Sequence, residues 1–290
     1  MLLDGKACSK VIEHDIKAEL QLLSVQPKLG IILILGNTDS DTYVQLKKKA
    51  CSRVGILCDI HKLSKEVSAA EIEALIDTLN DDVTVHGILL QLPLPCTLSE
   101  HTTQLLHRID PNKDVDGLHP HHFHRLSQPR CKSDDLFIAP CTPAGCLQLL
   151  DRYKIDIAGK DIVVIGRSSL VGLPLSLMLL QRHATVTICH SKTRNLQAKV
   201  RQADILIAAA GCPELVQKDW LKEDVVILDI GINYIEDTTC TKGYRMAGDV
   251  HFNDCKSVAV AITPVPGGIG PMTVAMLLKN ILICAKYALR

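Results

Sequence analysis

The sequence has few aromatic residues, no net charge and no uninterrupted apolar run that could cross a membrane. Phe, Trp and Tyr make up 3% of its 290 residues, which argues against a surface that stacks nucleic-acid bases. The 32 Lys and Arg residues balance 32 Asp and Glu residues, so a broad electrostatic surface for nucleic acid or anionic membranes is not expected. The C-terminal apolar candidate is broken by Lys279 and Asn280. We therefore expect a soluble protein that binds neither partner.

Cysteine is frequent, but the spacing typical of a metal or redox motif is missing. The 12 cysteines are scattered from Cys8 to Cys284 without a CxxC pair, whereas disulfide scaffolds are short and dense in cysteine. Asp4 and Lys6 come too early for the apolar core of a signal peptide. The sequence thus predicts mostly reduced, buried cysteines in a cytoplasmic protein.

Apolar runs alternate with helical patterns along most of the chain, which is typical of α/β proteins with parallel sheets. Ser68, with Glu71 three residues later, predicts the capping box of one helix. Thr142 and Pro143 predict the N-cap and first residue of another. We expect buried strands over 29–36, 55–63, 85–95, 161–166, 184–190, 204–211 and 225–231, and helices over 41–53, 68–80, 142–153, 171–182 and 272–289.

Residues 109–140 interrupt this rhythm. They contain four prolines, the third being Pro129, and show little periodicity, so we expect loops and a crossover there. Two domains of comparable size, divided near residue 140, follow from this interruption.

Residues 161–174, DIVVIGRSSLVGLP, resemble a strand, a tight turn and the start of a helix. Such a turn aims backbone N–H groups and the positive end of the helix dipole at an anion. Ser168 replaces the second glycine of the usual dinucleotide pattern, and the last glycine comes at Gly172. An ordinary strand–helix turn explains this motif about as well as a phosphate site.

The end of the next strand favours the phosphate site. NAD-specific folds place an acidic residue there to bind the ribose hydroxyls. This chain instead has His190, Ser191 and Lys192, with Arg167 beside the first turn. A hydroxyl and cations suit a 2′-phosphate, which a carboxylate would repel, so the sequence predicts NADP.

Polar residues in the first half form a second group. Tyr43 and Lys47 are four residues apart, on one face of a helix, although consecutive lysines usually form a solvated face. Gln91 ends a buried strand, and Asp114 and Asp116 lie in a predicted loop. Taken singly, none of these residues identifies a reaction.

Taken together and in order, the motifs closely resemble the bifunctional methylenetetrahydrofolate dehydrogenase/cyclohydrolase family. The resemblance implies NADP-dependent oxidation of 5,10-methylenetetrahydrofolate to the 5,10-methenyl cation, followed by hydrolysis to 10-formyltetrahydrofolate. It covers nearly the whole chain. The matching tracts are YVQLKKKA, VHGILLQLPLP, KDVDGL, PCTPAG, GRSSLVGLP, CHSKT, DIGIN, GDV and TPVPGGIGPMT.

The resemblance also implies residue roles. Lys47 is expected to be the central catalytic residue, chiefly for hydrolysis, with Gln91 bonded to it. Tyr43 is expected to stack on the folate and Asp116 to bind the pterin ring. Further expected contacts are Pro264 and Gly268 for the substrate, and Gly166, Arg167, Ser168, Ser191, Ile232 and Thr273 for the cofactor. No metal is expected.

The implied architecture is α/β, with two domains and a cleft between them. Residues 1–140 plus 271–290 would form a folate-binding catalytic domain, and residues 141–270 a Rossmann-type, doubly wound NADP domain. The family also implies a cytoplasmic homodimer that acts on tetrahydrofolate derivatives for purine biosynthesis.

The chain departs from the family pattern at three positions. His122 and His124 replace a common Asn and Gly, and we expect partly exposed loop histidines there. Leu173 stands where many bacterial members have Arg, so phosphate contacts are expected to be fewer. Two alternatives stay open: a catalytically inactive folate- or nucleotide-binding homologue, and another NADP dehydrogenase that acts on a small acid.

Overall fold

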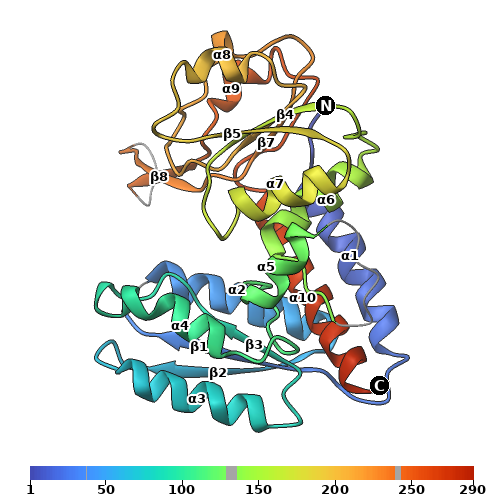
Figure 1. Cartoon of the computed structure of the whole chain (residues 1–290), viewed down its shortest axis with the longest axis vertical. Helices are drawn as coiled ribbons and strands as arrows, with labels where there is room; N and C mark the ends of the chain where they lie inside the picture. The colour runs from blue at the N-terminus through green and yellow to red at the C-terminus, as the bar shows by residue number, and fades with distance from the viewer. Residues whose placement is uncertain (37, 129–135, 239–242) are drawn as a thin grey trace. The chain divides into compact units, whose positions relative to one another are not determined.

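The computed structural model describes residues 1–36, 38–128, 136–238 and 243–290 (Figure 1). The chain forms two compact units, one of residues 1–9 and 142–273, the other of residues 10–141 and 274–290. Two helices, α1 (Gly5–Leu20) and α10 (Ile269–Ala288), contain residues of both units. Each unit has its own parallel sheet, which confirms the predicted two-domain α/β class.

The sheet of the second unit has three parallel strands in the order β2-β1-β3. These are β1 (Lys28–Ile34), β2 (Leu57–Leu63) and β3 (Gly87–Leu90). All three were predicted, but β3 ends five residues before the expected boundary at residue 95. Pro93 and Pro95 follow it, and proline has no N–H to donate to a neighbouring strand.

Helices cover both faces of this sheet. Ile32 and Ile34 of β1 pack against α3 (Ala69–Asp81), and α4 (Thr102–Arg108) joins the same core. Because successive strand residues point to opposite faces, Ile31 and Leu33 face the other side, where α2 (Thr38–Val54) contacts β1 and β2. The capping box of α3 forms as predicted, with Ser68 and Glu71 bonded to each other's backbone.

Residues 109–140 contain a helix where only loops were expected. α5 (Pro120–Ser127) begins with Pro120 at its first position, and the His119 ring accepts a bond from the His121 N–H. Proline at the first position of a helix is a start signal. The prediction missed this signal at Pro120 because it interpreted the histidines around it as loop residues. Residues 129–135, including Pro129, lie outside the described part.

The sheet of the first unit has five parallel strands in the order β10-β7-β6-β4-β5. Because β4 lies between β5 and β6, the strand order reverses beside it, and ligands of such sheets bind at this reversal. The strands are β4 (Asp161–Ile165), β5 (Thr185–Cys189), β6 (Ile205–Ala208), β7 (Val226–Asp229) and β10 (Ala261–Ile262).

Helices flank this sheet on both sides (Figure 1). One side carries α6 (Cys141–Arg152) and α7 (Gly172–Gln181), and the other carries α8 (Leu196–Val200) and α9 (Phe252–Cys255). α6 begins at Cys141, so Thr142 lies in its first turn rather than at the predicted N-cap. α10 likewise starts at Ile269, three residues before the predicted start.

Several elements had no counterpart in the sequence prediction. They include α1, the 3₁₀ helices η1 (Cys96–His101) and η2 (Lys218–Trp220), and the antiparallel hairpin of β8 (Asn233–Glu236) and β9 (Tyr244–Ala247). The first nine residues belong to the five-stranded unit, although the sequence placed them in the other. The Leu3 N–H donates to the Ile262 carbonyl at 2.9 Å, which ties the N-terminus to β10.

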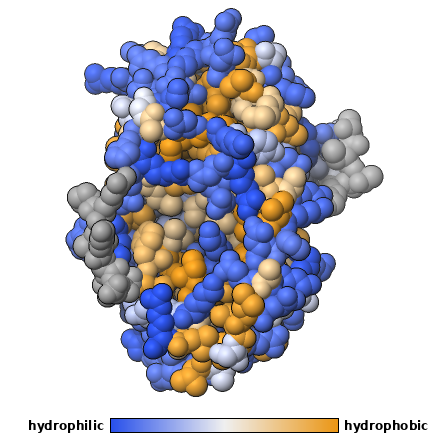
Figure 2. Space-filling model, turned by 90° about the vertical axis from the view of Figure 1, so that its right-hand side faces the viewer, coloured by the Kyte–Doolittle hydropathy of each residue, from blue (hydrophilic) through white to orange (hydrophobic). Residues whose placement is uncertain are grey.

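The placement of polar, apolar and cysteine side chains agrees with what the composition predicted. On the face drawn in Figure 2, hydrophilic side chains surround separate hydrophobic patches. α10 is long and apolar enough to cross a membrane, but 61% of its apolar window is buried in the protein, as in a core helix. The ten cysteines among the described residues are free thiols, and six of them are buried.

Candidate active site

The middle of α2 presents the first group of candidate residues. Tyr43 and Lys47 lie one helical turn apart and are both half-buried, whereas Lys48 and Lys49 are exposed. The interpretation that the three lysines form a solvated face therefore holds for Lys48 and Lys49. Lys47 is the lysine that turns toward the sheet.

Lys47 is held by Gln91, the residue that follows β3. Its Nζ donates a hydrogen bond of 3.0 Å to Gln91 Oε1. Gln91 is itself fixed, because its Nε2 donates to the Leu92 carbonyl at 2.6 Å and its N–H to the Ile32 carbonyl at 2.9 Å. Gln91 is 8% exposed, so this amide orients the amine of Lys47 without adding a second charge to the site.

Asp116 lies in a loop that is anchored on both sides. The buried Asp114 carboxylate accepts bonds from the N–H groups of Gly117 at 3.1 Å and His119 at 2.7 Å. The Ile88 N–H donates to the Lys113 carbonyl at 2.7 Å, which joins the loop to β3. Asp116 remains half-buried and able to accept from a ligand.

Burial raises the pKa of Asp114 to about 7, against a usual value of 3.8, although its backbone donors oppose the shift. Gly117 has a φ of +69°, and a Cβ there would come within 2.8 Å of the Ala139, Ile138 and Pro140 backbones. Both residues belong to KDVDGL and give the loop its shape.

Cys141 was expected to be one more buried cysteine, but it lies among the candidate residues. Its Sγ donates to the Val115 carbonyl at 3.3 Å and lies beside the Asp116 carboxylate, with Lys47 also acting on it electrostatically. Burial raises the pKa of this thiol well above its usual value, so it stays protonated. Its position within PCTPAG was the available signal. One unit therefore brings together Lys47, Gln91, Asp116 and Cys141.

The turn after β4 is tight and closely packed. A Cβ on Gly166 would lie 2.2 Å from the Ala209 carbonyl oxygen, and one on Gly172 would lie 2.2 Å from the Gly166 oxygen. Ser168 shapes the turn, since its Oγ accepts from the Val171 N–H at 3.2 Å and its carbonyl from the Leu173 N–H at 3.0 Å. The first turn of α7 thus lies directly against the end of β4.

Cationic and hydroxyl side chains follow the neighbouring strand at the same edge. Ile165 of β4 pairs with Cys189 of β5, so Arg167 and Ser191 come just after paired strand ends. The His190 N–H donates to Thr193 Oγ1 at 2.9 Å, and this closes a turn that exposes Ser191 and Lys192. Arg167 and Lys192 thus bring positive charge to the loops that follow these two strands.

The remaining predicted residues also lie in the five-stranded unit, not with Lys47. Ile232 follows β7 and is 39% exposed. Thr273 Oγ1 is 3.1 Å from Thr142 Oγ1. The Gly268 N–H donates to the Pro264 carbonyl at 2.8 Å, and Pro264 lines a cavity of about 210 Å³ together with Asp229.

Two buried carboxylates, which had no role in the sequence-based prediction, shape the loops beside the predicted cofactor residues. Asp229 accepts bonds from the N–H groups of Gly231, Asp249 and Val250. Asp249 accepts from three consecutive N–H groups, those of residues 210–212, and from Asn233 Nδ2 at 2.9 Å. Burial raises the pKa of Asp229 to about 7. Their places in DIGIN and GDV were the only sequence signal.

The histidines of α5 differ from expectation in one case. His124 is exposed, as predicted, but His122 is fully buried. Its Nε2 lies 2.8 Å from the Pro111 carbonyl and its Nδ1 accepts from the Ile138 N–H at 3.3 Å. Burial lowers its pKa to about 4, so His122 is a neutral core residue. Over the described residues, no three His, Cys, Asp or Glu side chains gather as a metal site would require.

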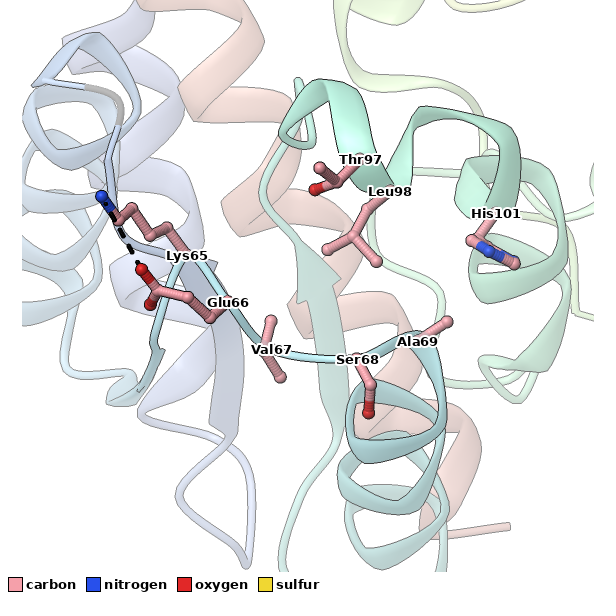
Figure 3. A pocket seen from close by; sticks show the side chains of 8 residues that line it. All are labelled: Lys65, Glu66, Val67, Ser68, Ala69, Thr97, Leu98 and His101. Atoms are coloured by element: carbon pink, nitrogen blue, oxygen red, sulfur yellow. Dashed lines mark ion pairs between the residues drawn. The ribbon is translucent and has the colours of Figure 1, made fainter.

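A further hollow of about 470 Å³ lies between the start of α3 and η1 (Figure 3). Lys65 and Glu66 form an ion pair of 3.7 Å at its rim, and Ser68 is engaged in the capping box. None of the predicted site residues lines it. It is therefore a surface feature beside the α3 cap, separate from the candidate residues.

Two family models match the chain. The tetrahydrofolate dehydrogenase/cyclohydrolase catalytic domain matches residues 3–116, and the NAD(P)-binding domain of the same name matches residues 140–289. The chain is also 45% identical over 288 residues to the bifunctional protein FolD of Pelobacter propionicus, covering 98% of this chain and 97% of that protein.

Solved structures agree over the full length. The bifunctional enzyme FolD, methylenetetrahydrofolate dehydrogenase/cyclohydrolase, from Campylobacter jejuni is 43% identical, with a TM-score of 0.92 and 99% of both chains covered. The Trypanosoma brucei enzyme, solved with NADP cofactor and inhibitor, is 36% identical, with a TM-score of 0.94 and coverage of 100% of this chain and 98% of that one.

Proposed function

Because this chain belongs to the tetrahydrofolate dehydrogenase/cyclohydrolase family, we propose that the residues gathered around Lys47 carry its chemistry. The chain is a bifunctional enzyme that oxidises 5,10-methylenetetrahydrofolate with NADP⁺ and hydrolyses the 5,10-methenyl product to 10-formyltetrahydrofolate. A catalytically inactive folate- or nucleotide-binding homologue receives no support, and neither does a dehydrogenase of small acids.

The Lys47–Gln91 bond is the observation that carries the hydrolytic mechanism. A neutral Lys47 amine can donate one N–H to Gln91 and still accept a proton from the water that attacks the methenyl carbon. Gln91 fixes the direction of the lone pair, because its own amide is bonded on both sides. In this proposal Lys47 is the base and proton shuttle, and Gln91 orients it.

The folate is held by residues around this pair. Tyr43, one turn from Lys47, offers a ring face for stacking. The Asp116 carboxylate can accept from the N–H donors of the pterin ring. We assign further substrate contacts to Pro264 and Gly268.

The cofactor residues fit NADP at the end of β4. Gly166 and Gly172 leave space that a Cβ would fill, and Arg167, Ser191 and Lys192 supply donors for a 2′-phosphate. We assign backbone or side-chain contacts also to Ser168, Ile232 and Thr273. When bound, NADP⁺ would supply the hydride acceptor for the methylene group, so the part of these residues in oxidation is to orient the two reactants.

The assay follows from the two activities. Purified protein is mixed with 5,10-methylenetetrahydrofolate and NADP⁺, and the absorbance of NADPH and of the methenyl intermediate is followed. We expect NADPH to accumulate while the methenyl signal rises briefly and decays. No signal with NADP⁺ or NAD⁺ would contradict the enzyme assignment.

Domain roles and setting are part of the same proposal. We assign folate binding to residues 1–140 plus 271–290 and NADP binding to residues 141–270. The catalytic-domain and NAD(P)-binding-domain family models match residues 3–116 and 140–289. We further propose a cytoplasmic homodimer that supplies one-carbon units for purine biosynthesis and binds neither nucleic acid nor membrane. Free thiols and zero net charge support that setting. Sedimentation of the purified protein tests the dimer.

A further inference from the structure

The side chain of Asn280 joins three segments of the unit with the three-stranded sheet that are far apart in sequence. Asn280 lies on α10 and is 4% exposed. Its Nδ2 donates to the carbonyl oxygens of Val115 at 2.9 Å and Ala139 at 3.0 Å. The same nitrogen lies 3.4 Å from Cys141 Sγ. An amide has two N–H donors, so the two carbonyls use both of them.

The Val115 carbonyl belongs to the peptide bond that leads into Asp116. Two donors hold this carbonyl, Asn280 Nδ2 and Cys141 Sγ, the latter at 3.3 Å. A carbonyl oxygen has two lone pairs, so both bonds can form together. The plane of this peptide, and with it the direction in which Asp116 leaves the backbone, is therefore set from α10 and from the start of α6.

The other anchors of the loop lie on either side of this peptide. Lys113 is bonded to Ile88 of β3, and Asp114 binds the N–H groups of Gly117 and His119. These bonds close the ends of the loop, whereas the bond from Asn280 fixes its middle. The Ala139 carbonyl, held by the same amide, keeps the chain before Cys141 against the loop.

We propose that Asn280 is a positioning residue that aims the Asp116 carboxylate at the pterin ring. This inference rests on the proposed role of Asp116. A change of well under an ångström in a binding group reduces productive binding, and Asp116 has no regular secondary structure to hold it. Asn280 supplies that support from a buried helix.

The test is a comparison of Michaelis constants. Asn280→Ala removes both donors, and Asn280→Asp keeps the shape but turns an acceptor toward two carbonyl oxygens. Both variants are expected to raise the KM for 5,10-methylenetetrahydrofolate by about tenfold and to leave the KM for NADP⁺ unchanged.

Leu282→Ala is the control, since it removes a buried side chain of the same helix and no bond to either carbonyl. It should lower Tm without raising the folate KM. If Asn280→Ala does not fold, Asn280→Ser, which keeps one donor, should show a smaller rise.

A double variant separates this proposal from the proposed function. If Asn280 acts through Asp116, Asp116→Ala with Asn280→Ala will have the folate KM of Asp116→Ala alone. If the two substitutions raise the folate KM by factors that multiply in the double variant, the positioning role is overturned. It is also overturned if Asn280→Ala raises the KM for NADP⁺ as much as the KM for folate. A normal folate KM in Asp116→Ala would instead contradict the role of Asp116 itself. A raised folate KM in Asp116→Ala but not in any Asn280 variant would refute only the role of Asn280.

Discussion

The Lys47 amine and the Gln91 carboxamide oxygen are joined by a 3.0 Å hydrogen bond between the middle of α2 and the end of β3. The two residues are 44 positions apart in the chain, so only the fold brings them together. Gln91 is buried and bonded at its other end, which makes it a rigid acceptor. The amine therefore has a fixed direction before any substrate binds.

Replacing Lys47 should separate the two activities. In Lys47→Ala we expect cyclohydrolase to fall at least ~100-fold, the size of a typical acid–base contribution, because the variant lacks the amine proposed to take a proton from water. The dehydrogenase should fall much less, since hydride transfer depends mainly on orientation. The measurement follows NADPH formation and methenyl decay separately. Lys48→Ala, on the exposed side of the same helix, is the control, and equal loss of both activities in a folded Lys47→Ala would refute the division of roles.

Cofactor preference should respond to Ser191. Ser191→Asp places a carboxylate in the turn after β5, where it would repel a 2′-phosphate and accept from a ribose hydroxyl. We expect the KM for NADP⁺ to rise on the order of tenfold, which corresponds to about 1.4 kcal/mol, while the KM for NAD⁺ does not rise. Ser191→Ala is the matched control, because it removes the hydroxyl without adding charge. Unchanged selectivity in the Asp variant would place the 2′-phosphate elsewhere.

The local parts of this structure could be predicted from the sequence. The capping box at Ser68 and the tight turn at Gly166 depend on residues within a few positions of each other, and both formed as predicted. The buried strands were visible as apolar runs because parallel strands are covered on both faces. Their ends were less well predicted, since β3 stops before Pro93.

The long-range parts could not be predicted. Asn280 interrupted an apolar run in the sequence, yet its amide holds a carbonyl 165 residues away. Cys141 was one of 12 cysteines, and only the packing of the start of α6 against the loop of Asp116 shows that the two residues are neighbours. His122 was expected at the surface, because the local sequence carries no signal of the Pro111 and Ile138 backbone groups that bind it.

The close packing at Gly166 predicts that even one added methyl group is harmful there. Gly166 has a φ of +124°, and the Cβ of Gly166→Ala would lie 2.2 Å from a backbone oxygen that cannot move freely. We expect a loss of about 1–3 kcal/mol in the free energy of unfolding and a weaker affinity for NADP⁺. Gly270→Ala is the control, because nothing lies within 4 Å of its Cβ position. Calorimetry and NADP⁺ titration would measure both effects, and equal behaviour of the two variants would contradict the close approach of Gly166 to the Ala209 carbonyl.

Asp114 should make stability depend on pH. Its pKa is about 7 in the folded chain, against a usual value of 3.8 that applies when the chain is unfolded. Between these values the folded state keeps a proton that the unfolded state releases, so stability falls as pH rises from about 4 to 7. The full loss is at most about 4 kcal/mol, and it is complete above pH ~7.

Asp114→Asn removes this titration. The asparagine keeps one acceptor oxygen, for the N–H of either Gly117 or His119. At pH ~5 the variant should be less stable than the natural protein, because it loses one of the two backbone bonds. The deficit should shrink, and can reverse, as pH rises to ~8. Denaturant unfolding at several pH values measures the difference.

Asp77→Asn is the control. Asp77 forms an exposed ion pair with Arg108, which lowers the pKa of Asp77. Its deficit should instead vanish as pH falls, because a protonated Asp77 gains nothing from Arg108. A difference in the free energy of unfolding between Asp114→Asn and the natural protein that stayed constant from pH ~4 to ~8 would contradict this prediction. The carboxyl of Asp114 would then not be the buried titrating group that its position between β3 and α5 implies.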